Sequence, residues 1–330
     1  MVAVLVMIAA VMLAAGFRQS QLIGEIEAHG GGSEFETIFP DFLDLSLATI
    51  CGDRHNRMFG VITGVHTTGR WFGDAELQRA GGFREAESIR IDESGLSEYG
   101  LESLGPNPNL LALVLQRCTV EGEGLSRLPA LPNLSALFVH GTPITELGPQ
   151  ADTRFPSLTQ LRLDGTRAGD DCLRQTTLLP RLELLTLGGT LISDAGMSAL
   201  TVHPRLAYLS LANTRITDEG LSRLAMSSTL RELYLDDTSI TDAGLKSLSR
   251  LKTLELLCVA RTTVTAAGLE PLVDLPRLKW LDLEDLRVGD DVEPMLMRMP
   301  ALERVNLRGT SVSREVAERI RTKIAIVEGP

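Results

Sequence analysis

Leucine recurs at a fixed interval of 24 residues along most of the chain. Counted from Leu110, the same position is apolar in the two preceding frames, at Ile62 and Ala86. It is leucine in the eight frames that follow, at Leu134, Leu158, Leu182, Leu206, Leu230, Leu254, Leu278 and Leu302. Eleven frames therefore follow one another without an insertion. A period of this length indicates a solenoid of stacked repeats, each packing on its neighbours.

Two neighbouring frames, LAYLSLANTRITDEGLSRL (206–224) and LRELYLDDTSITDAGLKSL (230–248), show the repeating pattern most clearly. The alternating leucines near its start, such as Leu209 and Leu211, predict a short strand with one face in the core. The Ile-Thr-Asp that follows predicts a capped outer helix with an acidic residue at its positive end. We therefore expect an α/β solenoid over 62–312, curved like a horseshoe, with a parallel inner β-sheet and short outer helices.

Small residues also recur at fixed places in the frame. A threonine follows the strand in most frames, where a buried hydroxyl can satisfy the backbone of the adjacent turn. An aspartate begins the helix, and a glycine two residues later allows neighbouring coils to approach closely. These residues are Thr142, Thr166, Thr190, Thr214, Thr238, Thr262 and Thr310, then Asp218 and Asp242, then Gly196, Gly220, Gly244 and Gly268. Cys118 and Leu286 replace the threonine in their frames.

The T-x-I-T-D-x-G-L frames resemble leucine-rich-repeat proteins, in the ribonuclease-inhibitor-like or cysteine-containing branch that has outer helices. The resemblance covers about 62–320 and implies an interaction protein rather than an enzyme. The order of apolar N-terminus, helix ending in glycines and repeats is similar to membrane-anchored leucine-rich-repeat proteins of planctomycete bacteria. The basic residues that usually precede such an anchor are absent here.

The two ends of the chain predict separate segments. Residues 1–17 are apolar throughout, and we expect a single-pass N-terminal anchor in the cell membrane, with export after signal-peptide cleavage as the alternative. No Lys or Arg precedes this segment, so the side of the membrane that the repeats face stays open. Residues 18–61 read as an adaptor that caps the first repeat. Residues 313–330 read as a C-terminal cap made of a helix and a short extended piece.

Composition narrows the possible functions. The net charge of −11 makes a nucleic-acid binder unlikely, because such a protein needs a basic surface. Four cysteines in 330 residues do not form a disulfide framework, and we expect Cys258 to be an exposed free thiol. None of the five histidines shares a metal-ligand spacing with another ligand, and no nucleophile or phosphate-loop motif is present. We therefore expect no catalytic activity, cofactor or metal.

Two positions in each predicted strand alternate with the core leucines and should point to the concave face. Aromatic and charged side chains gather there, which is typical of a binding surface. The predicted partner-binding residues are Phe138, Arg162, Leu184, Tyr208, Glu232, Tyr234, Leu256, Cys258, Trp280, Asp282 and Arg304.

Charged residues also recur just after the strands. Asp236, Asp237, Asp282, Glu284 and Asp285 could together hold a cation or a basic partner. We favour a solvent-exposed ladder of charges instead, because Arg261 falls between Asp237 and Asp285 and neutralises its middle.

The sequence as a whole predicts a scaffold that binds a protein partner on its concave face. The alternative is the substrate-recognition arm of a ligase-type adaptor, like the F-box leucine-rich-repeat proteins. That arm requires its own helical module before the repeats, and residues 18–61 give no convincing match to one.

Overall fold

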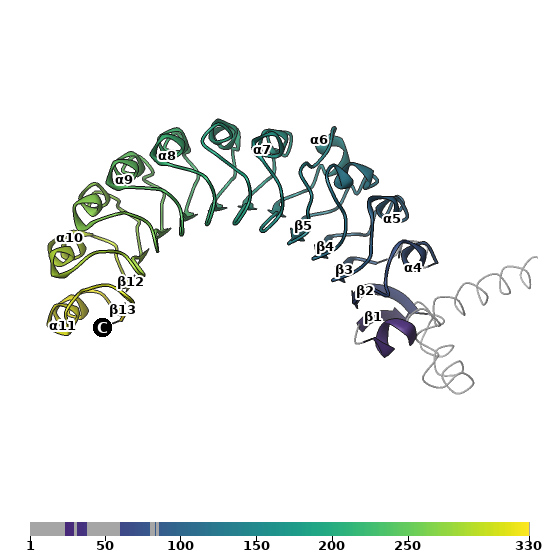
Figure 1. Cartoon of the computed structure of the whole chain (residues 1–330), viewed down its shortest axis with the longest axis horizontal. Coiled ribbons are helices and arrows are strands. Elements are labelled where there is room, and N and C mark those ends of the chain that lie inside the picture. The colour runs from purple at the N-terminus through teal and green to yellow at the C-terminus, as the bar shows by residue number, and fades with distance from the viewer. Residues whose placement is uncertain (1–23, 30–31, 38–59, 80–82, 84–85, 330) are drawn as a thin grey trace, which may run out of the picture. The chain divides into compact units, whose positions relative to one another are not determined.

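A computed structural model of the chain describes residues 24–29, 32–37, 60–79, 83 and 86–329. The chain forms two compact units, Met1–Leu158 and Thr159–Pro330. In each unit the strands lie along the inner side of the curve and the helices along its outer side (Figure 1). The predicted anchor at 1–17 and most of the predicted adaptor at 18–61 lie outside the described residues. No helix of the described residues is both long and apolar enough to span a membrane.

The first unit is a five-stranded sheet in chain order, in which β1 is antiparallel to β2 and the later strands are parallel. Its strands are β1 (Gly32–Thr37), β2 (Gly60–Thr68), β3 (Ser88–Asp92), β4 (Ala112–Gln116) and β5 (Ala136–His140). The helical turns between them are α4 (Asp74–Arg79), α5 (Glu98–Glu102), η3 (Gly124–Arg127) and α6 (Ala151–Arg154). Residues 24–28 form a further helical turn.

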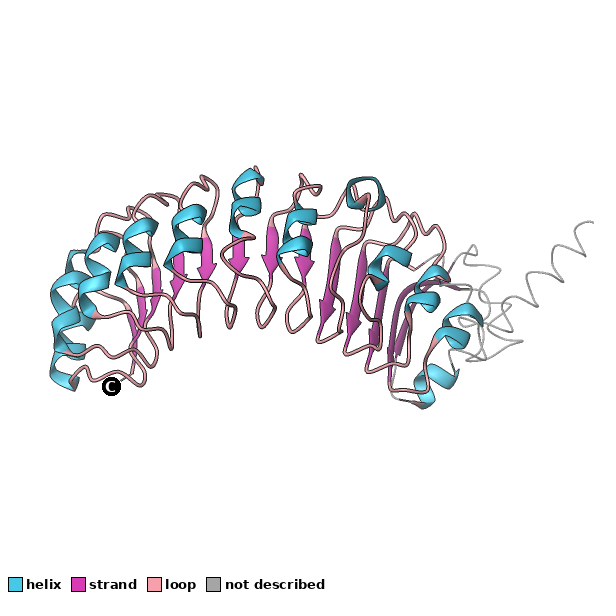
Figure 2. Ribbon diagram, turned by 45° about the horizontal axis from the view of Figure 1, so that its top comes forward, coloured by secondary structure: helices cyan, strands magenta, loops and turns pink. Residues whose placement is uncertain are grey.

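The second unit stacks eight parallel strands in chain order (Figure 2). They are β6 (Gln160–Arg162), β7 (Leu184–Thr186), β8 (Tyr208–Ser210), β9 (Glu232–Tyr234), β10 (Leu256–Cys258), β11 (Trp280–Asp282), β12 (Arg304–Asn306) and β13 (Ile326–Glu328). The helices are α7 (Asp170–Thr176), η4 (Met197–Val202), α8 (Asp218–Leu224), α9 (Asp242–Leu248), η5 (Ala266–Leu272), η6 (Asp290–Val292), α10 (Glu293–Arg298) and α11 (Arg314–Arg321).

The 24-residue period predicted from the leucines is confirmed by the strand register. Tyr208 pairs with Glu232, which pairs with Leu256, so partners on neighbouring strands are 24 residues apart. Arg304 pairs instead with Ile326, a step of 22 residues, at the C-terminal end. The predicted terminal helix and extended piece are present as α11 and β13. The fold is the predicted α/β solenoid in each unit, with parallel strands inside and short helices outside.

The core is built from the alternating apolar positions of each coil. Leu209 and Leu211 are fully buried, as are Ile216 on the way to the helix and Leu221 on its inner side. Four of the eight strands in the second unit, β6, β8, β9 and β11, show the same alternation, with a buried residue between two more exposed ones. The side chains between the core leucines therefore form the inner face of the sheet.

The threonine series closes the turn after most strands of the second unit, as predicted, whereas the Thr142 hydroxyl of the first unit donates to Leu115 O at 3.3 Å instead. The Thr214 hydroxyl donates to the Leu211 carbonyl oxygen at 2.6 Å, and Thr238 donates to Leu235 at 2.5 Å. The same bond to the residue three positions earlier is made by Thr166, Thr190, Thr262 and Thr310. The hydroxyls of Thr214, Thr238 and Thr262 satisfy carbonyl oxygens that accept no other bond within the described residues, whereas Thr166, Thr190 and Thr310 also bond the same oxygen through their own N–H at 3.3 Å.

The helix starts have the predicted cap and one further bond. Thr241 is the N-cap residue of α9, and its hydroxyl accepts from the Ala243 N–H. The carboxylate of Asp218 reaches from the preceding coil and accepts from the Thr241 N–H at 2.9 Å and the Thr241 hydroxyl at 2.6 Å. The same link joins Asp170 to Ser193, Asp194 to Thr217 and Asp242 to Thr265. Aspartate therefore joins neighbouring coils as well as favouring the helix start.

A left-handed residue follows each inner strand of the second unit from β6 to β12. Glycine fills this position at Gly165, Gly189 and Gly309, but Asn213, Asp237, Arg261 and Asp285 hold φ values of 53° to 56° there. This conformation costs most residues about 1–2 kcal/mol relative to a right-handed one. The repeat imposes the turn on each coil whether or not its sequence supplies glycine.

Candidate functional site

The inner face of the second unit carries most of the residues predicted to bind a partner. Successive strands place Tyr208, Glu232, Leu256, Trp280 and Arg304 in one row. A second row on the same strands contains Ser210, Tyr234, Cys258, Asp282 and Asn306. Arg162 is exposed, and Leu184, Tyr208, Glu232, Tyr234, Trp280, Asp282 and Arg304 are half-buried. The sequence pattern therefore identified the inner face of this unit correctly.

Phe138 belongs to the first unit. It lies on β5 beside Val114 of β4, and both side chains are half-buried on the side of the sheet opposite Leu137 and Val139. It is therefore an inner-face residue of its own unit, as predicted.

The predicted exposure of Leu256 and Cys258 is wrong. Both lie on the inner side of β10, but only 8% of Leu256 and 4% of Cys258 is exposed. Their neighbours on β9 and β11 include the larger Tyr234 and Trp280, which stand on either side of β10. A residue that points to the inner face is still buried when the side chains on both adjacent strands are larger.

Two tyrosines form a packed pair on β8 and β9. The ring centroids of Tyr208 and Tyr234 are 5.0 Å apart with the planes tilted by 33°, and the Tyr234 hydroxyl donates to Glu232 Oε2 at 3.2 Å. Burial raises the pKa of the Tyr234 phenol well above its usual range, and the adjacent Tyr208 raises it further. Both phenols therefore stay neutral hydrogen-bonding groups at physiological pH.

Trp280 is held between neighbours on β11. The guanidinium of Arg304 lies over its ring, 4.4 Å from the ring centroid, and the same guanidinium pairs with Glu328. The buried indole Nε1 has no hydrogen-bond partner among the residues that the structure describes. A cation–π contact of this kind fixes the ring in one orientation.

Carboxylates surround the aromatic rings. Asp236 Oδ1 accepts from the Ala260 N–H at 3.0 Å, and Asp282 Oδ1 accepts from the Glu284 N–H at 3.0 Å. Burial raises the pKa of both carboxyl groups above the usual aspartate range. The charge of Asp282 raises that of Asp236 further, and the charge of Glu284 raises that of Asp282 further. The inner face near β9–β11 is therefore acidic.

The charge ladder predicted after the strands forms in part. Arg261 makes a two-pronged ion pair with Asp237, at 2.8 Å for the nearest contact. No ion pair between Arg261 and Asp285 is found in the described part of the chain. On that side Arg261 is attracted instead by the charge of Glu284, which helps to raise the pKa of the guanidinium after the larger effect of Asp237. The pair is exposed and therefore contributes little to stability.

Groups suited to catalysis or metal binding are scarce on the described surface. Within the described ranges, no three His, Cys, Asp or Glu side chains are placed to hold a metal ion. Cys118, Cys172 and Cys258 are buried free thiols. Burial raises the pKa of the Cys258 thiol, and the nearby Asp236 and Asp282 raise it further, so this thiol is a poor nucleophile.

Comparison with known proteins identifies the repeat. A family model described as Leucine Rich repeat matches residues 107–128, 205–225 and 227–249. An internalin from Listeria monocytogenes shares the fold, with a TM-score of 0.54, 15% identity, and coverage of 88% of this chain and 95% of that one. The chain is a leucine-rich-repeat protein.

A second solved structure shows the same fold. A chain of the mouse RP105/MD-1 complex matches with a TM-score of 0.58 and 18% identity over 76% of this chain and 44% of that one. A search of curated protein sequences found no match. Leucine-rich-repeat folds serve in general as protein-interaction scaffolds, and they are typical of binding proteins rather than of enzymes.

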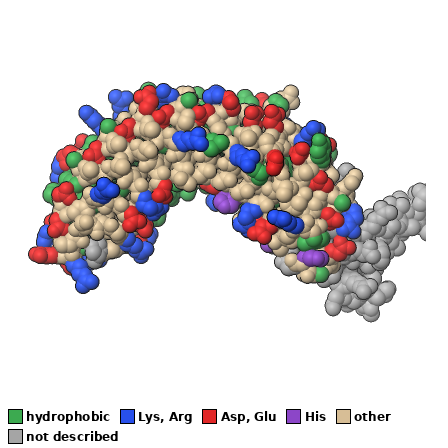
Figure 3. Space-filling model, viewed as in Figure 1, with side chains coloured by type: hydrophobic (Ala, Val, Ile, Leu, Met, Phe, Trp, Pro, Cys, Tyr) green, Lys and Arg blue, Asp and Glu red, His purple; other side chains and the backbone are tan. Residues whose placement is uncertain are grey.

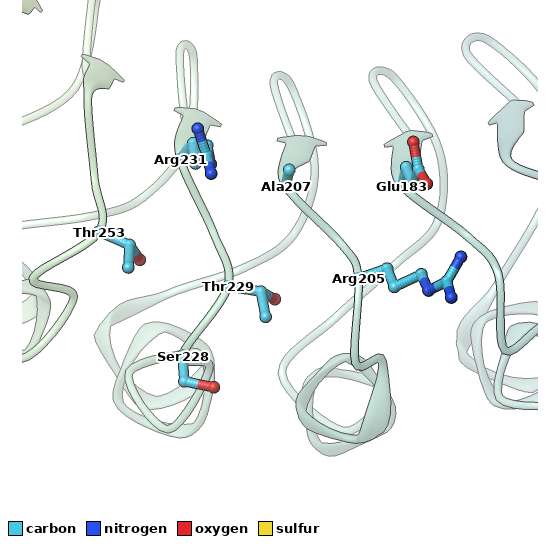
Figure 4. Close-up of a pocket in the computed structure, with 7 residues that line it drawn as sticks. All are labelled: Glu183, Arg205, Ala207, Ser228, Thr229, Arg231 and Thr253. Atoms are coloured by element: carbon cyan, nitrogen blue, oxygen red, sulfur yellow. The ribbon is translucent and has the colours of Figure 1, made fainter.

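A second concave feature of this leucine-rich-repeat protein lies in the second unit, beside the segments that lead into strands β7 to β10. A pocket of about 550 Å³ is lined by Glu183, Arg205, Ala207, Ser228, Thr229, Arg231 and Thr253 (Figure 4). It forms because Ala207 stands between the longer Glu183 and Arg231, and because Ser228 and Thr229 replace the proline and arginine of the preceding coil. These departures from the repeat are visible in the sequence and are the signal from which the pocket could have been predicted.

The helix ends near this pocket expose a short apolar row. Leu178, Val202 and Met226 occupy the same position in three successive coils and are 40%, 60% and 69% exposed. On the face shown in Figure 3, acidic and basic side chains are interspersed. The row is small, and the aromatic inner face is the larger candidate for binding.

Proposed function

We propose that this leucine-rich-repeat protein is a non-catalytic scaffold that binds a protein partner on the inner face of its second unit. The observation that carries the proposal is the concentration of half-buried aromatic rings on that face. Tyr208, Tyr234 and Trp280 lie on β8, β9 and β11. Parallel strands are about 5 Å apart, so the three rings span roughly 15 Å, the size of an interface hot spot.

The rings are also held in place before any partner arrives. Tyr208 packs on Tyr234, Tyr234 bonds to Glu232, and Arg304 lies over Trp280. Side chains fixed in advance lose little conformational entropy on binding, which is a property of hot-spot residues. The carboxylates around them disfavour a polyanion such as a nucleic acid.

The test is partner capture by the full-length protein from an extract of its source cells. Tyr234→Ala and Trp280→Ala should each reduce capture of the bound partner at least tenfold, an effect of about 1.4 kcal/mol or more. Two outer-surface variants are matched controls. Met226→Ala removes an equally prominent apolar side chain, and Lys246→Ala removes a charge from α9.

Both rings help to cover β10, so thermal melting is measured on every variant. The proposal expects folded inner-face variants that have lost capture and outer-surface variants that bind like the original protein. Capture that is lost in the outer-surface variants and kept in both ring variants would place the binding surface on the helices instead.

A further inference from the structure

The rows that carry the aromatic rings also carry carboxylates on both sides of β10. On the β9 side stand Glu232, Tyr234 and Asp236, and on the β11 side stand Trp280, Asp282 and Glu284. We call these six residues the acidic-aromatic patch. Between them lie the small, buried inner residues of β10 and its continuation, Leu256, Cys258 and Ala260. Each side of the patch thus presents one ring and two carboxylates.

The four carboxylates of the patch are only partly neutralised within the protein. None of them forms an ion pair with a Lys or Arg of the described ranges, whereas the neighbouring arginines already have carboxylate partners. Arg261 pairs with Asp237, although its charge also attracts Asp236 and Glu284, and Arg304 and Arg308 both pair with Glu328. The patch therefore holds negative charge that hydrogen bonds orient and that one nearby arginine offsets only in part.

The electrostatics of the half-buried Asp236 and Asp282 agree with this geometry. Burial raises the pKa of the Asp236 and Asp282 carboxyl groups, and repulsion from neighbouring carboxylates raises it further. A group whose ionised form is disfavoured in the free protein gains most from an added positive charge. By linkage, a cation that binds here lowers both pKa values and binds less well in acid.

The arrangement suits several separated cations better than one metal ion. Within the described residues no three ligands converge on a metal position, so the carboxylates are spread along the face. Lysine and arginine place an aliphatic stem beside a charged end, and the stem can pack on an aromatic ring. Arg304 over Trp280 is an example of such a contact within the chain itself.

We propose, on the basis of the interaction function proposed above, that the partner presents an extended basic segment to the acidic-aromatic patch. Its lysine or arginine side chains reach the carboxylates of the patch while their stems lie against Tyr234 and Trp280. Charge complementarity of this kind selects the partner and speeds its association.

Fluorescence anisotropy with labelled peptides tests the proposal on the full-length protein. The probes are a twelve-residue peptide of alternating lysine and serine and its counterpart with glutamate in place of lysine. The decisive variant is Asp236→Asn with Asp282→Asn, because asparagine keeps the acceptor oxygens that bond to the Ala260 and Glu284 N–H groups. The matched control, Asp171→Asn with Asp274→Asn, removes the same charge from exposed positions outside the inner face.

The lysine peptide should bind the original protein and the control alike and should bind the decisive variant about tenfold more weakly. The glutamate peptide should not bind. An equal loss of peptide affinity in both double variants would mean that the peptide is attracted only by the net charge of −11. No loss of affinity in either variant would mean that the peptide binds elsewhere. Either result overturns the basic-partner proposal. If Tyr234→Ala loses partner capture but the lysine peptide does not bind the original protein, the basic-partner proposal is wrong. The proposed interaction function would still stand.

Discussion

Single hydroxyl groups close the turn after most strands of the second unit. The threonine after the strand donates to a buried carbonyl oxygen three residues earlier, in coil after coil. The Leu211 carbonyl oxygen has no donor other than Thr214 in the described part of the chain, so this hydroxyl removes a desolvation cost that an apolar residue of the same shape would leave.

Thr214→Val should therefore lower the free energy of unfolding by about 1–2 kcal/mol despite its similar shape. Urea denaturation followed by circular dichroism measures the change. Thr177→Val is the matched control, since the Thr177 hydroxyl makes the same bond to Arg174 O at 2.7 Å but is exposed to water. Equal effects of the two substitutions would contradict the account of the threonine series.

The residue with a left-handed backbone conformation after each strand also contributes to stability. Asp285 holds φ at 56°, a conformation that glycine adopts without a steric cost. Asp285→Gly should be more stable than Asp285→Ala by about 1 kcal/mol, measured by urea denaturation. A more stable alanine variant would show that this turn is not under the strain that its φ implies.

The face of the sheet on which a side chain lies could be predicted from the sequence, but the exposure of that side chain could not. Alternation with the leucines placed Leu256 and Cys258 correctly on the inner side of β10. Their burial depends on Tyr234 and Trp280, which are 24 residues away in the neighbouring frames and larger than the residues between them. The exposure of a side chain on a sheet face depends on the side chains of its own strand and of both adjacent strands.

Neighbouring coils are joined at their helix starts by aspartate. The Asp218 carboxylate holds the backbone and hydroxyl of Thr241 in the next coil and leaves no space beside it. A Cβ atom on Gly244 would lie 2.3 Å from Asp218 Oδ1. The glycine of the T-D-x-G motif is therefore required by the aspartate of the preceding coil.

Gly244→Ala should cost about 1–3 kcal/mol of unfolding free energy, because the added methyl group displaces this carboxylate. Gly169→Ala is the control, since nothing lies within 4 Å of its Cβ position, and it should change stability by less than about 0.5 kcal/mol. Thermal and urea unfolding of both variants measure the difference. A neutral Gly244→Ala would contradict the proposed link between coils.

The positions of the strands and helices could be predicted from the sequence more accurately than the kind of helix. The 24-residue period fixed the strands, but the outer segment Ala266–Leu272 is a 3₁₀-helix rather than an α-helix. Pro271 lies inside it and lacks the N–H that an α-helical bond requires. The aspartates were predicted to lie at the positive end of a capped helix, and their bond to the next coil was missed because the sequence alone does not show which coil a side chain reaches.

At the scale of the whole protein, binding and stability should oppose each other at the acidic-aromatic patch. The pKa of Asp282 is raised in the folded chain, so its ionised form lowers stability at pH values above that raised pKa. Residues that weaken the fold in this way are typical of functional sites.

Asp282→Asn should therefore raise the urea midpoint at pH 7, where the original carboxylate is ionised. The gain should disappear as the pH falls below the ordinary aspartate pKa, since the carboxyl group is then protonated in both the folded and the unfolded chain. Urea unfolding at pH 7 and at pH 3 measures both parts. A lower midpoint at pH 7 would mean that Asp282 supports the fold and is not held there for binding.

A protein partner is proposed to bind the inner face of the second unit. Site-specific photo-crosslinking locates the partner on the surface, with the crosslinking amino acid placed either at Ser210 on β8 or at Ser222 on α8. Ser210 lies on the inner face beside Tyr234, and Ser222 is exposed on an outer helix. A crosslinked partner from Ser210 and none from Ser222 is the expected result. Crosslinking from Ser222 alone would contradict the claim.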